Sequence, residues 1–257
     1  MGTFLFDDVV FGPVNSRRLG ISLGVNLLPA DCKVCNFNCV YCECGWTKKP
    51  IQSAVLPDFD KIKTALNEKL ASLSMDNQPI DMITFAGNGE PTLHPYFDKI
   101  INHTLLLRDK YYPNSKVAVL SNSTRISNEK ISQALGRIDY NILKLDSVVQ
   151  ETIEVINQPV KKIDVDQLLS DLKKFDNLMI QTLFLKGQFK DQPINNTTDD
   201  EVEKWLDALK TLNPKLVMIY TIQRDTPGEH IYPVKLSELH MIADKVKKIG
   251  LDVSVSG

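Results

Sequence analysis

Residues 21–42 read ISLGVNLLPADCKVCNFNCVYC, in which an apolar run is followed by a cysteine-rich segment. With Cys44, all five cysteines of the 257-residue chain lie between Cys32 and Cys44. Disulfide frameworks spread their cysteines along the chain and favour an even number, whereas a tight cluster in a chain of this length is typical of metal binding. The segment therefore predicts a metal site directly after a buried strand.

Short apolar runs alternate with amphipathic stretches along the rest of the chain. The runs are rich in Val, Ile and Leu and show little two-residue alternation, as expected of strands that are covered on both faces. The strands predicted from these runs are Ile21–Leu28, Asp81–Phe85, Lys116–Leu120, Asn141–Leu145, Leu178–Phe184, Leu216–Thr221 and Leu251–Val255.

Helical periodicity fills several intervals between these strands. The helices predicted from it are Phe59–Leu73, Glu129–Leu135, Asp166–Phe175, Asp200–Leu212 and Ser237–Ile249. Asp58 and Ser127 are expected to cap helix N-termini, and Gly250 is expected to end the last helix. We expect Gly187–Thr198 to be a polar loop.

Strands that alternate with helices predict βαβ units and a parallel sheet, either doubly wound or rolled into a partial barrel. In both architectures ligands bind beyond the carboxyl ends of the strands. We expect one domain over residues 1–257, in which residues 1–20 form a short N-terminal extension and residues 21–257 form the α/β fold.

The composition excludes several classes of protein. The formal net charge is -2, so no strong field favours nucleic acid or a membrane surface. The segment Met1–Asp8 has neither a basic region nor a long apolar run, so no signal peptide is expected. No stretch approaches the ~20 apolar residues that a membrane span needs. We therefore expect a cytoplasmic protein without a membrane partner.

The spacing of the cysteines singles out three of them. Cys35, Cys39 and Cys42 form a C-x3-C-x2-C pattern, and Tyr41 directly precedes the last. Cysteine thiolates are the usual ligands of iron–sulfur clusters, and three of them leave the fourth iron of a cubane open. An open metal position is typical of catalytic sites.

Other uses of the cysteines remain open at this point. Cys32, Cys35, Cys39 and Cys42 also form two C-x2-C pairs, which would suit zinc. Cys32 and Cys44 stand outside the three-cysteine pattern. They are either inert small residues, ligands of an auxiliary centre or redox-active thiols.

The cysteine pattern resembles the signature of the radical S-adenosylmethionine superfamily, C-x3-C-x-aromatic-C in the loop after the first barrel strand. The resemblance implies a partial (β/α)6 TIM-like barrel of parallel strands. It also implies a [4Fe–4S] cluster on Cys35, Cys39 and Cys42 and an enzyme of the oxidoreductase or lyase type. Such an enzyme reductively cleaves S-adenosylmethionine to a 5′-deoxyadenosyl radical, which abstracts hydrogen from a substrate.

The segment Gly87-Asn88-Gly89-Glu90 follows the second predicted strand and resembles the superfamily's G-G-E motif, with one residue inserted. The resemblance implies that Glu90 contacts the amino group of S-adenosylmethionine. Polar residues also follow the later strands, and alternation puts Lys144 and Asp146 on one face, where they must pair with each other or with a ligand. The residues predicted to bind the cofactor are Tyr41, Gly87, Asn88, Gly89, Glu90, Ser121, Asn122, Lys144, Asp146, Gln181 and Tyr220.

Four further side chains have two interpretations each. His94 follows the Glu90 motif and is a candidate for the site wall. Arg224 would clamp a carboxylate or phosphate, or pair with Asp225. Arg17 and Arg18 would anchor phosphate, or form surface ion pairs.

A wider resemblance covers the chain from about residue 10 to its end. The segments FGPVNSRRLGISLGVN (11–26), KLD (144–146), INQP (156–159), QT (181–182) and YTIQR (220–224) resemble a group of small Fe–S oxidoreductases related to wyosine-type transfer-RNA enzymes. This implies a reduced flavodoxin- or ferredoxin-like electron donor. The substrate is left open between a small molecule, a peptide or protein, and transfer RNA.

One argument speaks against wyosine-type chemistry, and one alternative function remains open. Pyruvate chemistry of the wyosine type would need a Schiff-base lysine, for which Lys48, Lys49 and Lys186 are candidates, and a second cluster, for which dispersed cysteines are missing. Alternatively, the chain is a non-catalytic electron-transfer or redox-sensing protein, with Cys32 or Cys44 as a fourth cluster ligand. That hypothesis leaves Glu90 and the lysine–aspartate pair without a role.

Overall fold

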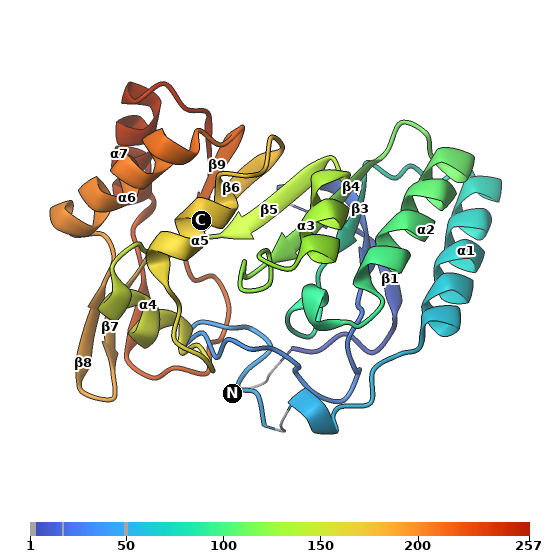
Figure 1. The fold of residues 1–257 in the computed structure, drawn as a ribbon, viewed down its shortest axis with the longest axis horizontal. Helices are drawn as coiled ribbons and strands as arrows, with labels where there is room; N and C mark the ends of the chain where they lie inside the picture. The colour runs from blue at the N-terminus through green and yellow to red at the C-terminus, as the bar shows by residue number, and fades with distance from the viewer. Residues whose placement is uncertain (1–3, 17, 49–50) are drawn as a thin grey trace.

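A computed structural model describes residues 4–16, 18–48 and 51–257 of the chain. Its main sheet has the strand order β1-β2-β3-β4-β5-β6-β9-β11 and curls into a half-barrel (Figure 1). The strands are β1 (Val10–Ser16), β2 (Gly20–Val25), β3 (Met82–Phe85), β4 (Lys116–Ser121), β5 (Tyr140–Lys144), β6 (Leu178–Leu183), β9 (Leu216–Tyr220) and β11 (Val253–Ser256).

Neighbouring strands from β2 to β11 pair in parallel. Within the described part of the main sheet, the antiparallel pair is β1 with β2, so part of the expected N-terminal extension is an edge strand of the sheet. The expectation of a partial TIM-like barrel of parallel strands is confirmed. Each predicted strand is present, with ends that differ by a few residues.

In Figure 1, α1 and α2 lie at one side of the half-barrel, and α6 and α7 lie at the other. They are α1 (Phe59–Met75), α2 (Phe97–Tyr111), α3 (Glu129–Gly136), α4 (Gln150–Asn157), α5 (Val165–Leu172), α6 (Asp199–Leu212) and α7 (Leu236–Lys248), with short 3-10 turns at Ile51–Ser53 and Pro91–Leu93. Of these helices, α2 and α4 are not among those predicted from the sequence.

The two faces of the sheet bury different side chains. On the outer face, Leu23, Phe85 and other strand residues join the helix residues Ile62 and Leu66 in one large core. On the inner face, a smaller apolar cluster fills part of the half-barrel. Met82 belongs to this cluster. Because alternate residues of a strand face opposite sides, the inner face is free to carry polar groups toward the carboxyl ends of the strands.

Local signals account for the helix ends. Asp58 caps α1 as expected, since its carboxylate accepts a hydrogen bond from the Lys61 N–H. The prediction for α3 is wrong by one residue: Asn128, not Ser127, accepts from the Ile131 N–H. Gly250 follows α7 with φ of 85°, a left-handed conformation that ends a helix readily.

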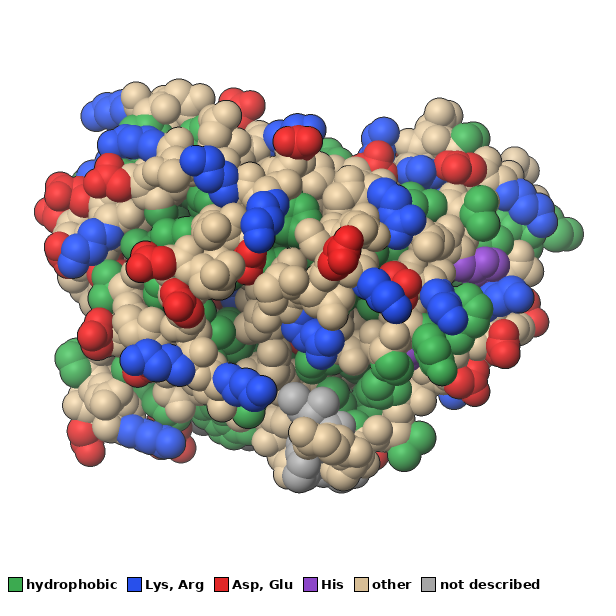
Figure 2. Space-filling view, in the orientation of Figure 1, with side chains coloured by type: hydrophobic (Ala, Val, Ile, Leu, Met, Phe, Trp, Pro, Cys, Tyr) green, Lys and Arg blue, Asp and Glu red, His purple; other side chains and the backbone are tan. Residues whose placement is uncertain are grey.

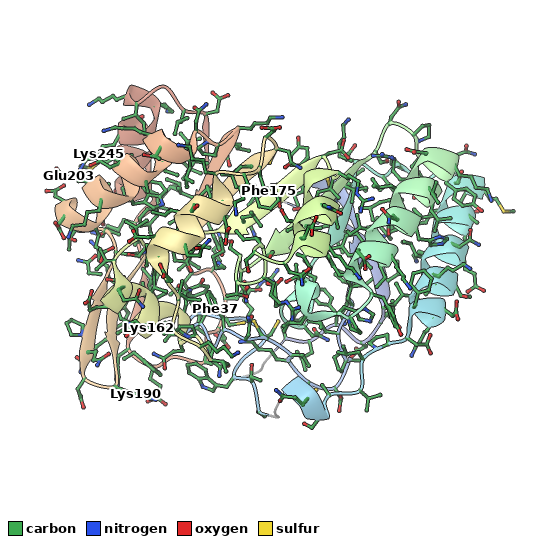
Figure 3. The ribbon with its side chains drawn as sticks, in the orientation of Figure 1. Phe37, Lys162, Phe175, Lys190, Glu203 and Lys245 are labelled. Carbon is green, nitrogen blue, oxygen red and sulfur yellow. The ribbon has the colours of Figure 1, made fainter. Side chains whose placement is uncertain are left out.

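The expectation of a loop at Gly187–Thr198 is wrong. β7 (Leu185–Phe189) and β8 (Gln192–Asn195) form a hairpin there, and β10 (Ile231–Pro233) pairs with β7 to complete a small antiparallel sheet. These strands are short and mostly polar, so they lack the apolar runs that predict strands. Lys190 lies at the hairpin's tip, at the edge of the molecule in Figure 3.

Among the described residues, no helix is long and apolar enough to cross a membrane. Side chains of both charges are interspersed over the face shown in Figure 2. No single-sign patch dominates this face, as the small net charge leads one to expect.

Candidate active site

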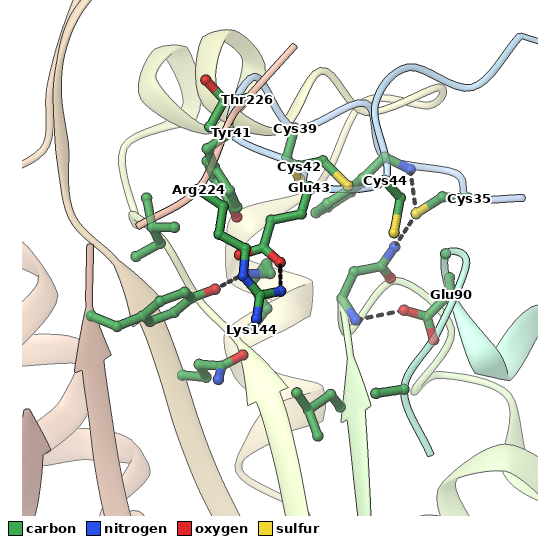
Figure 4. Close-up of a pocket in the computed structure, with 18 of the residues that line it drawn as sticks. Cys35, Cys39, Tyr41, Cys42, Glu43, Cys44, Glu90, Lys144, Arg224 and Thr226 are labelled. Atoms are coloured by element: carbon green, nitrogen blue, oxygen red, sulfur yellow. Dashed lines mark hydrogen bonds and ion pairs between the residues drawn. The ribbon is translucent and has the colours of Figure 1, made fainter. Parts of the chain in front are cut away.

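A pocket of about 300 Å³ opens where the carboxyl ends of β3 to β9 meet the cysteine-bearing loop (Figure 4). Cys35, Cys39, Cys42 and Cys44 line it on the loop side. Polar side chains from the strand ends line the opposite side. Ligand sites in α/β barrels lie at this end of the strands.

The cysteine loop is fixed to the barrel at both of its sides. The Val34 N–H donates to the Asn88 carbonyl over 2.8 Å, and the Val40 N–H donates to the Ile156 carbonyl over 2.9 Å. Phe37 is 5% exposed and packs in a cluster with Val40 and Ile156, inside the molecule in Figure 3. The loop therefore holds its cysteines between β3 and α4 without regular secondary structure of its own.

Gly89 permits the cysteine loop to approach the end of β3 closely. Its φ is 135°, and a Cβ there would lie 1.9 Å from the Val34 carbonyl oxygen. Any larger residue would push the cysteine loop off the end of β3. The glycines of this motif thus have a steric role, as close backbone approach requires.

Two buried amides point at cysteine sulfurs. Asn157 Nδ2 donates to Cys39 Sγ over 3.4 Å, and Asn122 Nδ2 lies 3.6 Å from Cys35 Sγ. The Phe37 N–H also donates to Cys35 Sγ, over 3.4 Å. Hydrogen bonds of this kind stabilise negatively charged sulfur.

Lys33 adds a buried positive charge to the same loop. It is 4% exposed, and its Nζ donates to the Gly45 carbonyl over 2.9 Å. Burial lowers the pKa of Lys33, but the negative charge of nearby thiolates, Cys42 foremost, raises it above the ordinary value. The sequence analysis did not single out Lys33, because one lysine among polar loop residues carries no pattern.

The thiols themselves titrate differently. A hydrogen bond from Cys44, helped by Lys33 and opposed by burial, lowers the pKa of Cys42 to about 5. Burial raises the pKa of Cys35 to about 12. Among the described residues, no three His, Cys, Asp or Glu side chains are arranged to hold a single metal ion. A cubane places a different iron at each thiolate, so its ligands stand further apart than those of one ion.

The donor set fits an iron–sulfur cluster. Three thiols, two amide donors and a buried ammonium surround one end of the pocket. Thiolates supply the ligands that such clusters prefer, and the donors and the cation stabilise the cluster's negative charge.

Glu90 is the second charged centre of the pocket. It is 2% exposed, and its carboxylate accepts hydrogen bonds from Thr92, from the Ser121 hydroxyl over 2.9 Å and from the Asn122 N–H over 2.6 Å. Burial raises the pKa of Glu90 above its usual value, in opposition to these bonds. The carboxylate is thus held rigidly beside Cys35, where it can accept a cationic group of a ligand (Figure 4).

A third group of buried side chains joins β5 to the cysteine loop. Lys144 Nζ lies 3.6 Å from Asp146 Oδ1 and donates to the Tyr220 hydroxyl over 3.1 Å. The hydroxyl of Tyr41 donates to Asp146, as does Asn157 Nδ2, over 2.7 Å. Burial lowers the pKa of Lys144, but Asp146 and its other neighbours raise it well above the ordinary value, so the ammonium stays charged.

Most of the residues predicted from the sequence meet in this pocket. Those that line it are Cys35, Cys39, Cys42, Tyr41, Gly87, Gly89, Glu90, Ser121, Asn122, Lys144, Gln181 and Tyr220. Two predicted cofactor residues do not line it. The Asn88 amide instead holds Phe6 and the Pro29 carbonyl, and Asp146 lies behind Lys144.

The structure also shows where the side chains with open interpretations lie, as far as it describes them. His94 does not line the pocket: it is 3% exposed and donates from Nε2 to the Pro57 carbonyl over 2.8 Å. Arg224 lines the pocket and pairs with Glu43 at 2.6 Å, not with Asp225. Arg18 lines the pocket, whereas Arg17 lies outside the described residues.

Asn157 belongs to the site, although the sequence predicts no role for it. It appears only within the segment INQP (156–159). It ends α4, so the only signal was a polar residue after an apolar helical turn. Its contacts to Cys39 and Asp146 come from parts of the chain more than ten residues away in sequence. No local pattern encodes them.

Comparison with known proteins identifies the class to which this fold and pocket belong. Residues 32–193 match the Radical SAM superfamily, and the chain belongs to that superfamily. It is therefore a radical S-adenosylmethionine enzyme whose cofactors are a [4Fe–4S] cluster and S-adenosylmethionine.

One relative and two solved structures define its place more narrowly. A UPF0026 protein of Helicobacter pylori is 32% identical over 252 residues, which is 96% of this chain and 76% of the relative. A radical SAM methyltransferase from Sphaerobacter thermophilus superposes with a TM-score of 0.67 at 10% identity, over 91% of this chain and 65% of the other. TYW1 with a lysine–pyruvate adduct bound superposes with a TM-score of 0.58 at 14% identity, over 88% of this chain and 73% of the other. The chain thus spans about two thirds of the methyltransferase's length, and it shares its fold with both of these proteins.

Proposed function

We propose that Cys35, Cys39 and Cys42 hold the cluster and that the chain cleaves S-adenosylmethionine to start hydrogen abstraction from a substrate. The observation that carries this proposal is the convergence of the three thiols, Glu90 and Lys144 on one pocket. When bound, the cluster supplies the electron that cleaves the S–C5′ bond and so generates a 5′-deoxyadenosyl radical. The protein's own residues bind, orient and shield the reactants.

Glu90 and Asn122 would receive the methionine end of the cofactor. The Glu90 carboxylate is negative and fixed by its hydrogen bonds, which suits an ammonium group. Asn122 lies between Glu90 and Cys35, because its N–H contacts the carboxylate and its amide contacts the sulfur. These contacts couple the cofactor position to the cluster position.

Lys144 would bind a ribose oxygen of the cofactor. Its ammonium is charged and lines the pocket, and Asp146 behind it holds it in place. Asp146 would thus position Lys144, whereas the sequence predicts direct contact of Asp146 with the cofactor. Tyr220 and Gln181 complete this side of the pocket.

The substrate is a small molecule, a peptide or protein, or transfer RNA, and a reduced flavodoxin- or ferredoxin-like protein would supply electrons. Wyosine-type pyruvate chemistry gains no support from the candidate lysines. Lys186 pairs with Glu238 at 2.7 Å, Lys48 is exposed, and Lys49 lies outside the described residues. Neither Lys48 nor Lys186 lines the pocket.

One observation favours a second candidate, an electron-transfer protein. Cys44 lines the pocket, hydrogen-bonds to Cys42 and donates to the Gly87 carbonyl over 3.5 Å, so a fourth thiol is available beside the three proposed ligands. A fourth protein ligand would close the iron that S-adenosylmethionine needs. This candidate and the radical enzyme therefore differ in whether the cofactor reaches the cluster.

Electron paramagnetic resonance of the reduced, anaerobically reconstituted protein distinguishes them. We expect S-adenosylmethionine to change the cluster spectrum of the wild type and of Cys44→Ala, and we expect Cys39→Ala to lack the intact cluster. A wild-type spectrum that is indifferent to the cofactor, but becomes responsive in Cys44→Ala, would support the electron carrier instead.

A further inference from the structure

Arg18 brings an unengaged positive charge into the half-barrel. It lies in the turn between β1 and β2, yet its side chain lines both the active-site pocket and an adjoining cavity on the inner face of the sheet. Its guanidinium carbon is 4.7 Å from the centre of the Tyr220 ring. Within the part of the chain that the structure describes, Nη1 is buried and makes no hydrogen bond.

The other cations of the pocket are engaged. Lys144 pairs with Asp146, and Arg224 pairs with Glu43. Lys33 contacts the cysteine loop that carries the cluster thiols. Arg18 makes no ion pair with any described residue, so its charge is available to a ligand.

A second polar atom of the same pocket is unsatisfied. The side-chain oxygen of Gln223 is buried, and it has no hydrogen-bond partner among the described residues. Gln223 follows β9 and lines the same pocket as Arg18 and Tyr220. Two buried groups without partners in one cavity indicate a ligand that satisfies both, because an unmet buried hydrogen bond costs free energy.

We infer that Arg18, Tyr220 and Gln223 form a subsite for an anionic oxygen group of the substrate, either a carboxylate or a phosphate. The contact with the Tyr220 ring holds the guanidinium in place, and its N–H groups form the fork that such anions accept. The side-chain oxygen of Gln223 would accept a hydrogen bond from an N–H or O–H group of the same molecule, beside the anionic group. The inference rests on the proposed function, because it assigns the substrate of that same site.

The carboxylate of S-adenosylmethionine is a poor candidate for this subsite. Glu90 and Asn122, which would bind the methionine end, follow β3 and β4, whereas Tyr220 ends β9. β5 and β6 stand between β4 and β9 in the sheet. The guanidinium of Arg18 therefore contacts a strand end that is separated from the proposed methionine site by two strands.

The probes for the test are inorganic phosphate and acetate, with chloride at equal ionic strength as the reference. Binding to the reconstituted protein with S-adenosylmethionine present is measured from the rise in its thermal unfolding midpoint with anion concentration. We expect one of the two probes to raise the midpoint more than chloride does. Arg18→Gln should weaken that apparent affinity at least tenfold, the loss expected for a charge-assisted bond. A response to acetate alone indicates a carboxylate, and one to phosphate alone indicates a phosphate.

Two controls make the result specific. Arg137→Gln removes an exposed arginine on α3 and should respond as the wild type does. Arg18→Lys keeps the charge, and its response should lie between those of the wild type and Arg18→Gln. Equal responses in wild type and Arg18→Gln, or no response beyond chloride, would overturn the inference.

Calorimetry separates this inference from the proposed function. We expect Arg18→Gln to bind S-adenosylmethionine as tightly as the wild type. A tenfold loss would assign Arg18 to the cofactor and overturn the substrate subsite while the proposed function stands. Failure of the wild type to bind the cofactor would instead contradict the proposed function.

Discussion

The side-chain amide of Asn157 donates a hydrogen bond to the sulfur of Cys39 over 3.4 Å. The same amide donates to Asp146 over 2.7 Å, and Asp146 in turn lies beside Lys144. The end of α4 thereby links one proposed cluster ligand to the charged pair that lines the cofactor side of the pocket. A single residue can thus influence both the cluster and the pocket.

Asn157→Ala should lower the midpoint potential of the cluster by tens of millivolts. Loss of an N–H donor to sulfur destabilises the reduced, more negative form of a cluster. The variant should also lose about 1–3 kcal/mol of stability, because a buried carboxylate loses a donor. A redox titration followed by electron paramagnetic resonance measures the potential, and an unchanged value would remove Asn157 from the cluster environment.

Lys33→Met should lower the same potential, also by tens of millivolts. The buried ammonium stabilises the additional negative charge of the reduced cluster, and methionine keeps the length of the side chain without its charge. Lys48→Met is the matched control, since Lys48 is exposed on the same loop. Equal potentials in all three proteins would show that Lys33 only holds the Gly45 carbonyl.

Glu90→Gln should leave the cluster spectrum intact and weaken S-adenosylmethionine binding at least tenfold. The substitution removes the charge proposed to receive the ammonium group but keeps the size of the side chain. Isothermal titration calorimetry of the reconstituted protein measures the affinity. Wild-type affinity in this variant would place the methionine end elsewhere in the pocket.

Gly89→Ala should prevent stable assembly of the cluster. The added Cβ would lie 1.9 Å from the Val34 carbonyl, and the φ of 135° disfavours any side chain. We expect a loss of more than ~2 kcal/mol in chemical denaturation, together with a lower iron content after reconstitution.

Gly136→Ala is the matched control for Gly89→Ala, and we expect it to stabilise the protein. A Cβ at Gly136 meets nothing within 4 Å, and the residue ends α3. This variant should gain about 0.4–1 kcal/mol and keep its full iron content. Similar losses in both variants would show that the steric contact at Gly89 is not what fixes the cysteine loop.

The sequence predicts the barrel well because its parallel strands are buried on both faces and appear as apolar runs. The same principle hides β7 and β8, whose short polar segments, such as Gln192–Asn195, resemble a loop. At the pocket, the motif residues Cys35 and Glu90 can be identified because their spacing is local. Lys33 and Asn157 act through contacts that only the folded chain creates, so no sequence pattern reveals them.

The buried position of the Arg18 side chain likewise cannot be predicted from the sequence. A residue in a turn before a strand is expected at the surface, where it would pair with a carboxylate. The structure instead brings its guanidinium to Tyr220, about two hundred positions later in the chain. The half-barrel's open interior, which depends on all of its strands, provides that position.

Formation of 5′-deoxyadenosine by the reduced, anaerobically reconstituted protein tests the central claim most directly. We expect the wild type to convert S-adenosylmethionine to 5′-deoxyadenosine, Cys44→Ala to retain the activity, and Cys39→Ala to lose it. Absence of product from a wild-type protein with an intact, reducible cluster that binds the cofactor would contradict the account, as would equal product from Cys39→Ala.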